Sequence, residues 1–191
     1  MSGLGLIRGC FPAQIMALKR TSEVITISDV ITIDPTFAVK EINLPLDILN
    51  REVFVVTGVD FQVVSEISFA RLDSFGDIRG RLSSTRPTAL PNLSNNNTLA
   101  TLDFTFGASF VGGPPAVSNF GAIEQLSGST PPANMDYVGI IATDNCYLSQ
   151  DLDGNLGTAN SATMNVRIYG YRAQADAATY AGLVQSEALS V

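Results

Sequence analysis

The sequence predicts one all-β domain, an antiparallel sandwich or barrel, with a different kind of segment at each end. Runs of alternating apolar and polar residues recur roughly every ten residues, separated by clusters of Gly, Pro, Asn and Asp. This spacing does not match the strand and helix alternation of a parallel sheet. The 191 residues suffice for one domain with a full core. We divide the chain into an N-terminal arm, residues 1–22, a β-sandwich body, residues 23–172, and a C-terminal helical tail, residues 173–191.

The arm is apolar and weakly basic. Before the first acidic residue, Glu23, it contains Arg8, Lys19 and Arg20. This cluster indicates a weakly basic arm on an acidic body, and chance clustering of three charges explains it equally well. Residues 12–19, PAQIMALK, predict two helical turns, because proline is favoured at the first helical position. Such an apolar segment is expected to pack under the domain or against a neighbour.

The body begins with two extended stretches and a tight connection. Residues 23–33, EVITISDVITI, alternate isoleucine with polar residues. The pair Asp34-Pro35 ends this run, because proline cannot donate a hydrogen bond to a neighbouring strand. A second short strand is expected around Phe37 and Val39, and residues 46–51, LDILNR, predict a single helical turn.

The most β-prone run covers residues 52–64, EVFVVTGVDFQVV. Its first half has apolar residues on both faces, which indicates a central strand covered on each side. Gly58 predicts a bulge or a bend in this strand. One face is expected to carry Val53, Val55, Val59, Phe61 and Val63, and the other Phe54, Val56 and Val64.

Further strands and a long loop follow. Residues 67–73 and 76–84 predict short strands joined through residues 74–77, and residues 99–111 predict a longer strand. Residues 83–98 contain two prolines and three successive asparagines, which predicts a polar loop on the surface.

The end of the body contains the clearest alternation in the chain. Residues 119–133 are irregular, with one turn expected at residues 122–126, and residues 136–142 and 145–149 predict two strands that pair with each other. The final strand, residues 163–172, reads TMNVRIYGYR. Its alternation places Met164, Val166, Ile168 and Gly170 on one face, and Asn165, Arg167, Tyr169 and Tyr171 on the other.

The alanine-rich tail then predicts a helix. Its apolar residues Tyr180, Leu183 and Val184 have helical spacing, and Asp176 near the start favours the helix dipole. We expect this helix to dock on the sheet or on a neighbouring subunit.

The composition argues for an assembly. Charged residues make up only 15% of the chain, so neighbours are expected to cover much of its surface. The net charge of −7 opposes non-specific binding of nucleic acid by the body. Cys10 and Cys146 have no metal-ligand spacing and are expected to be free, mostly buried thiols.

The residues needed for common catalytic sites are scarce. The chain has no histidine, which excludes the usual serine and cysteine triads. It has no glycine-rich phosphate-binding motif. A pair of carboxylates could hydrolyse a glycoside, but the acids are scattered and no Trp is present to line a sugar groove. We expect no catalytic residues and no enzymatic activity.

One segment resembles a cation site. Asp151, Asp153 and Asn155 alternate as oxygen ligands around Gly154 within a predicted loop, residues 151–158, as in calcium loops. No glutamate closes the motif at its twelfth position. These three residues are our candidate metal ligands, with calcium as the cofactor they would hold. The alternative is a polar hairpin turn in which Asp-Gly-Asn supplies the positive-φ positions.

The outward face of the last strand is a second candidate site. Arg167 and Arg172 flank Tyr169 and Tyr171. Basic and aromatic side chains together can bind single-stranded nucleic acid. The same residue types are enriched at subunit interfaces, which is the simpler interpretation.

The chain as a whole resembles a single jelly-roll viral capsid protein. The resemblance lies in the apolar arm, in about eight antiparallel strands with Asn/Ser/Thr/Pro-rich loops, and in a last strand, VRIYGYR, that runs into a helical tail. The resemblance implies an antiparallel eight-stranded jelly-roll sandwich that self-assembles into an icosahedral shell and resides in the virion. Its partners would be itself, as a trimer or pentamer within the shell, and other capsid proteins.

The basic residues of the arm are fewer than in capsid proteins that package nucleic acid, so direct nucleic-acid binding is expected to be weak or missing. A shell over an internal membrane, or a minor capsid or cement role, suits this arm better. The alternative function is a receptor- or carbohydrate-binding β-sandwich, as in a spike or adhesin domain.

Overall fold

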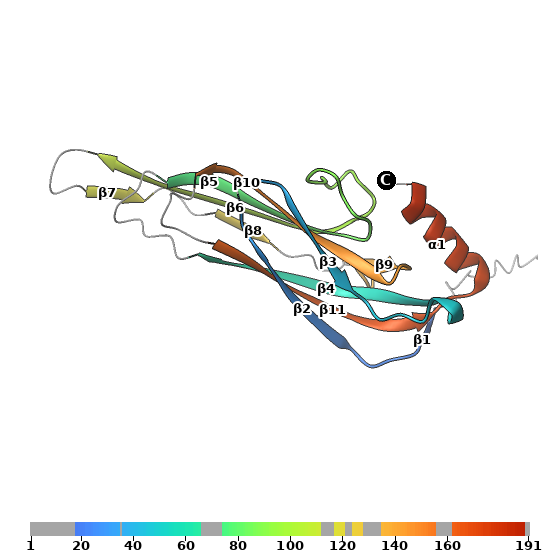
Figure 1. The fold of residues 1–191 in the computed structure, drawn as a ribbon. Coiled ribbons are helices and arrows are strands. Elements are labelled where there is room, and N and C mark those ends of the chain that lie inside the picture. The colour runs from blue at the N-terminus through green and yellow to red at the C-terminus, as the bar shows by residue number, and fades with distance from the viewer. Residues whose placement is uncertain are drawn as a thin grey trace, which may run out of the picture.

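The computed structural model describes residues 18–34, 36–65, 74–111, 117–120, 124–127, 135–155 and 162–189. These residues form two antiparallel sheets and one C-terminal helix, so the fold is an all-β sandwich (Figure 1). Among them, no helix has the length and apolar character needed to cross a membrane. In chain order the elements are β1 (Lys19–Arg20), β2 (Ile25–Thr32), β3 (Ala38–Asn43), the 3-10 turn η1 (Ile48–Asn50), β4 (Glu52–Ser65), β5 (Ser74–Ser83), β6 (Thr98–Val111), β7 (Val117–Phe120), β8 (Glu124–Ser127), β9 (Gly139–Ile141), β10 (Asn145–Asn155), β11 (Ala162–Gln174) and α1 (Ala177–Leu189).

The two sheets have different strand orders. In the first sheet, β11 lies between β4 and an outer row formed by β1 and β2, and β9 follows β4 on the other side. In the second sheet the order is β3, β10, β5, β6 and β7, with β8 also paired to β6. We call them sheet A and sheet B. Most consecutive strands lie in different sheets, so the chain crosses repeatedly from one layer to the other.

This crossing corrects the predicted pairing of residues 136–142 with residues 145–149. β9 pairs with β4 in sheet A, whereas β10 pairs with β3 and β5 in sheet B. The short connection between β9 and β10 therefore joins two layers and is not a hairpin within one sheet. In a sandwich, neighbouring strands in the sequence can be hydrophobic on facing layers without being hydrogen-bonded to each other.

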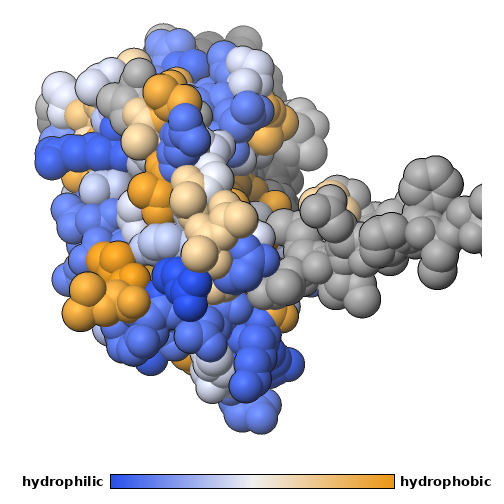
Figure 2. Space-filling model, turned by 90° about the vertical axis from the view of Figure 1, so that its right-hand side faces the viewer, coloured by the Kyte–Doolittle hydropathy of each residue, from blue (hydrophilic) through white to orange (hydrophobic). Residues whose placement is uncertain are grey.

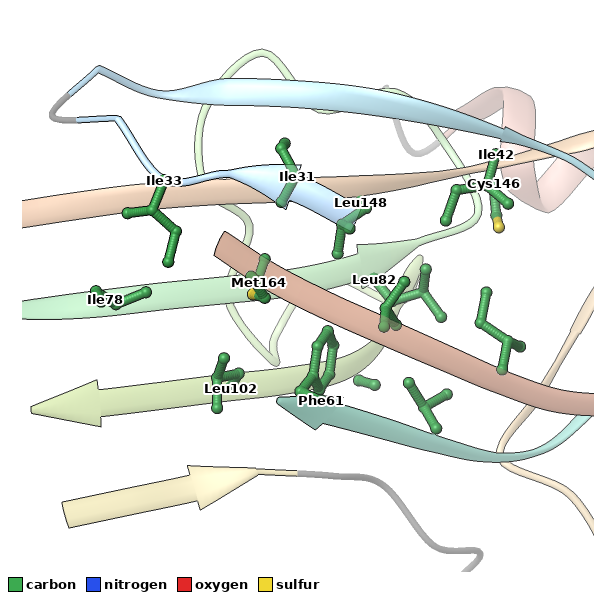
Figure 3. Close-up of a cluster of buried hydrophobic side chains, with 14 of the residues drawn as sticks. Ile31, Ile33, Ile42, Phe61, Ile78, Leu82, Leu102, Cys146, Leu148 and Met164 are labelled. Carbon is green, nitrogen blue, oxygen red and sulfur yellow. The ribbon is translucent and has the colours of Figure 1, made fainter. Parts of the chain in front are cut away.

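The main core lies between the two sheets (Figure 3). Met164, Val166 and Ile168 are buried in it, which confirms the predicted inward face of the last strand. Cys146 is buried there as a free thiol, as predicted. The other cysteine predicted to be free, Cys10, lies outside the described residues. Burial raises the pKa of the Cys146 thiol to about 12. The thiol is thus a packing group in this core.

A bulge in β4 exchanges the faces of that strand. Tyr169 of β11 lies opposite Gly58, but Gly170 lies opposite Val56, so Thr57 is an extra residue in β4. The bulge predicted at Gly58 is confirmed. The extra residue reverses the alternation of inward and outward side chains. The prediction that Val53 shares a face with Val59 and Phe61 is therefore wrong. Val53 and Val55 pack in a second cluster, whereas Val59, Phe61 and Val63 belong to the main core.

The second cluster lies where α1 covers sheet A. Val53 and Val55 of β4 and Ala173 of β11 are fully buried there. Tyr180, Leu183 and Val184 of α1 pack on them, as the helical spacing predicted. At the start of α1, Asp176 accepts a hydrogen bond from the backbone N–H of Thr179 at 2.8 Å. The tail is helical from Ala177, and residues 173–174 still belong to β11.

Several predicted boundaries change. Residues 74–77 are part of β5 and not a connection, and Glu124–Ser127 form β8 where a turn was expected. Lys19 lies in the strand β1 and not in a helical turn. Residues 12–17 and the predicted strand 67–73 lie outside the described residues. The helical turn expected within residues 46–51 is confirmed as η1.

Candidate functional site

The calcium-like segment lies in a strand. Asp151, Asp153 and Asn155 are all part of β10, which pairs with β5 over this length. The predicted loop over residues 151–158 and the alternative hairpin turn are therefore both wrong for residues 151–155. The positive φ of 129° at Gly154 is the remaining sign of a turn-like backbone.

An arginine lies between the two acidic residues of this segment. Arg79 Nη2 is 3.3 Å from Asp151 Oδ2 and 3.4 Å from Asp153 Oδ2. The guanidinium occupies the position from which a cation would have to contact both carboxylates. Within the described parts of the chain, no cluster of three or more His, Cys, Asp or Glu side chains suits a metal ion. Calcium binding by Asp151, Asp153 and Asn155 stays a prediction, and Arg79 is the group that would compete with it.

Four residues of β11 were predicted to form an outward-facing site, and three of them, Arg167, Tyr169 and Tyr171, do lie on that face. Arg167 is exposed, and Tyr169 and Tyr171 are half-buried. The guanidinium of Arg20 lies 4.7 Å from the centre of the Tyr171 ring, a cation–π contact that holds the root of the arm on the sheet. Arg172 differs, because it pairs with Phe54, whose side chain lies in the main core. It therefore does not share the face of Arg167.

A polar depression of about 490 Å³ lies on the outer face of sheet A. Its side chains come from three neighbouring strands: Ser28 and Val30 from β2, Asn165 and Arg167 from β11, and Asp60 and Gln62 from β4. The hydroxyl of Tyr169 donates to Asp60 Oδ2 at 3.0 Å. In the described structure, Arg167 has no carboxylate within 4.0 Å of its guanidinium. The sequence indicated Arg167 and Tyr169, but strand pairing was needed to bring Ser28 and Asp60 beside them.

The helix α1 carries a buried acid that sequence reasoning missed. Glu187 is its buried residue, and Glu187 Oε1 accepts a hydrogen bond from the backbone N–H of Ala142 at 3.0 Å. Burial raises the pKa of the Glu187 carboxyl, and hydrogen bonds from Ala142 and Thr143 oppose this rise. The helix has no basic residue that could balance the charge. Glu187 thus connects the tail to the turn before β10 by a bond whose strength depends on pH.

The long loop between β5 and β6 is tied to sheet B. Arg81 donates through Nε to the carbonyl of Pro91 at 3.2 Å and through Nη1 to the carbonyl of Leu102 at 2.7 Å. Arg81 Nη2 also lies 2.9 Å from Asp103 Oδ1. At the base of the loop, the Ser84 N–H donates to the carbonyl of Asn97. The Arg81 side chain of β5 and the Ser84–Asn97 hydrogen bond therefore tie this surface loop to the sheet.

No protein-family model matches the chain, and no curated protein is significantly similar to it.

Proposed function

We propose that this protein is a structural virion protein that folds as a jelly roll and self-assembles into an icosahedral shell. The observation that carries the proposal is the nested order of strand pairing. β2 pairs with β11, β3 with β10, β4 with β9, and β5 with β6. The first of these strands thus pairs with the last, the second with the next to last, and so on inward.

Nested pairing supports the jelly-roll assignment for a geometrical reason. A long antiparallel hairpin of four strand pairs, rolled up once, places alternate pairs in opposite layers. The pairs β2/β11 and β4/β9 lie in sheet A, and the pairs β3/β10 and β5/β6 lie in sheet B. Within this assignment β1 extends the edge row of sheet A, and β7 with β8 is an insertion beside β6. Viral capsid proteins and lectins are the main classes that use such double-sheet rolls.

The two ends of the chain support self-assembly. β1 pairs with residues 173–174 of β11, immediately before α1. The arm therefore leaves the sandwich beside the helical tail, and one neighbouring subunit could contact both. Trimers or pentamers of the chain itself, and other capsid proteins, are the proposed partners. The proposal assigns no catalytic step to the protein. With only three basic residues in the arm, contact with an underlying membrane or another capsid layer is favoured over contact with a genome.

The test is direct observation of the purified full chain. We expect size-exclusion chromatography and negative-stain electron microscopy, across several salt, pH and calcium conditions, to reveal closed particles of uniform diameter. A protein that stays monomeric at high concentration under all of these conditions would overturn the proposal.

A deletion locates the role of the arm. Removing residues 1–17 leaves every described element in place and should lower the yield of particles while the melting temperature stays the same. Unchanged particle yield would show that the arm does not connect subunits.

The polar depression on sheet A favours a second candidate function, binding of a carbohydrate or receptor. Arg167, Asn165 and Gln62 offer hydrogen-bond donors, and Asp60 offers an acceptor, within a space of ligand size. A glycan array with the wild type and the Arg167→Ala variant tests it. Binding that is lost in the variant supports this function, and no binding by the wild type eliminates it.

A further inference from the structure

A leucine at one end of the molecule is almost fully exposed in the part of the chain that the structure describes. Leu49 in η1 is 95% exposed, and the adjacent Ile48 is 44% exposed. They lie between β3 and β4, at the end of the sandwich that also carries β1. Figure 2 views this end and shows separate hydrophobic groups among polar ones. A single exposed leucine is common on protein surfaces, so the backbone that presents it decides its significance.

The turn that carries Leu49 is held by several hydrogen bonds. Asp47 accepts from the backbone N–H of Asn50, and Asn50 Nδ2 donates to Asp47 Oδ2 at 2.6 Å. The N–H of Asp47 in turn donates to Glu52 Oε2 at 3.0 Å. Arg51 closes the turn in the left-handed region, with a φ of 56°. These hydrogen bonds hold the backbone around Leu49 in place. Less conformational entropy is therefore lost when a partner buries the Leu49 side chain.

A small apolar pocket opens next to this turn. Its volume is about 120 Å³, and it lies at one end of the main core. Its apolar lining comes from β2, from the segment after β3 and from β4: Ile25, Ile27, Leu44, Pro45, Leu46 and Phe54. An apolar cavity of about 150 Å³ can hold benzene, so a space of this size accepts the four-carbon side chain of a leucine.

The pocket and the turn carry complementary charges. Arg172 also lines the pocket, and no carboxylate of the described structure lies within 4.0 Å of its guanidinium. Asp47, two residues before Leu49, is exposed, and in the described structure its carboxylate accepts hydrogen bonds only from Asn50. A leucine that entered the pocket from outside would bring this carboxylate towards Arg172.

We propose that Leu49 of one copy inserts into this pocket of a second copy, and that Asp47 then pairs with Arg172 across the contact. The pocket and the turn are separated by only a few residues, because Leu46 lines the pocket. One surface patch therefore carries both halves of the contact, which is the arrangement that a two-fold symmetric dimer requires. Each copy would insert one leucine and receive one. This dimer contact deepens the assembly proposal and supplies one kind of contact within a shell, but it does not require that shells form.

Sedimentation velocity of the full chain over a concentration series tests the contact. The wild type should dimerise, and Leu49→Ser should weaken dimerisation at least about tenfold, because two buried leucines are lost. Leu93→Ser is the matched control, since Leu93 is also an exposed leucine, at 75%, but lies in the β5–β6 loop. It should leave the dimerisation constant unchanged. A monomeric wild type, or equal effects of the two substitutions, would overturn the proposal.

The ion pair is tested by a double-mutant cycle. Asp47→Asn keeps one of the two side-chain oxygens that accept from Asn50, and Arg172→Gln removes the opposite charge. Each variant should weaken dimerisation by about threefold to tenfold, and the double variant should be no weaker than the single ones. Fully additive effects would show that the two side chains do not meet.

Electron microscopy of the same variants separates this contact from the shell proposal. Unchanged dimerisation and normal particle yield in Leu49→Ser would refute the leucine contact and leave the shell standing. Dimers that depend on Leu49 without any particles would support the contact and refute the shell. A wild type that forms neither dimers nor particles would refute both.

Discussion

Gly80 of β5 and Met164 of β11 meet across the main core, where the end of the Met164 side chain fills the space that a Cβ on residue 80 would take. A Cβ added to Gly80 would overlap with Met164 Sδ and lie 2.8 Å from Met164 Cε. Met164 is fully buried, so its side chain has little room to move away. At this point the two sheets pack directly on each other, and the Met164 sulfur of sheet A lies where a side chain on residue 80 of sheet B would be.

Gly80→Ala should lower the free energy of unfolding by about 1–3 kcal/mol, because the added methyl overpacks the core. Urea denaturation followed by circular dichroism measures the change. Gly182→Ala is the matched control, since a Cβ on Gly182 in α1 would meet nothing within 4 Å. That substitution should leave stability unchanged or raise it by up to about 1 kcal/mol. A neutral Gly80→Ala would show that Met164 moves aside without cost.

The free energy of unfolding should fall as the pH rises above the ordinary pKa of a glutamate, because burial raises the pKa of Glu187. A carboxyl whose pKa is higher in the folded state stabilises the fold fully below its unfolded pKa. It loses this contribution as pH rises through the folded pKa. Glu187→Gln should flatten this part of the pH profile, as measured by thermal melts from mildly acidic to mildly alkaline pH. Parallel profiles of the two proteins would contradict the assignment.

Arg79 should compete with calcium for Asp151 and Asp153. Calcium at millimolar concentration should leave the melting temperature of the wild type unchanged, because the guanidinium already contacts both carboxylates. In Arg79→Ala, the two acids lose this partner, and calcium should then raise the melting temperature. Magnesium serves as the control for a non-specific ionic effect. A calcium-dependent rise in the wild type would instead support the predicted metal site.

Cys146 should resist thiol reagents until the protein unfolds. The thiol is buried and its pKa is raised to about 12, so almost no reactive thiolate is present at neutral pH. In a Cys10→Ser background, labelling by a chromogenic disulfide should follow the urea unfolding curve seen by circular dichroism. Rapid labelling of the folded protein would show that the main core opens locally around β10.

The strands with strict alternation could be predicted from the sequence. In β11, burial alternates along the strand, and the inward and outward residues are those that the pattern TMNVRIYGYR indicates. In β4 the predicted faces were wrong although the bulge was predicted, because the extra residue Thr57 reverses the alternation within one continuous β-prone run. A pattern of period two can reveal that a bulge exists but cannot show which residue is the extra one.

The surfaces were harder to predict than the strands. The pocket beside η1 combines Ile25, Leu44 and Phe54 with Arg172, which are far apart in the sequence and meet only through the nested pairing. Asp151 and Asp153 looked like metal ligands because their partner Arg79 comes from another strand. In each case, a neighbour from a distant part of the chain decides what a side chain can do.

The pairing of Ile27 with Ile168 has a consequence for biosynthesis. Among the described strands, β2 has no hydrogen-bonded neighbour in sheet A until β11 has left the ribosome, so the sandwich can close only after β11 has been synthesised. Until then the nascent chain exposes β-prone segments such as β4, and exposed segments of this kind favour aggregation. Because β1 and α1 flank β11, the surfaces that they carry form in the same late step, and in the proposed assembly any contact through these surfaces would have to wait until the subunit has folded.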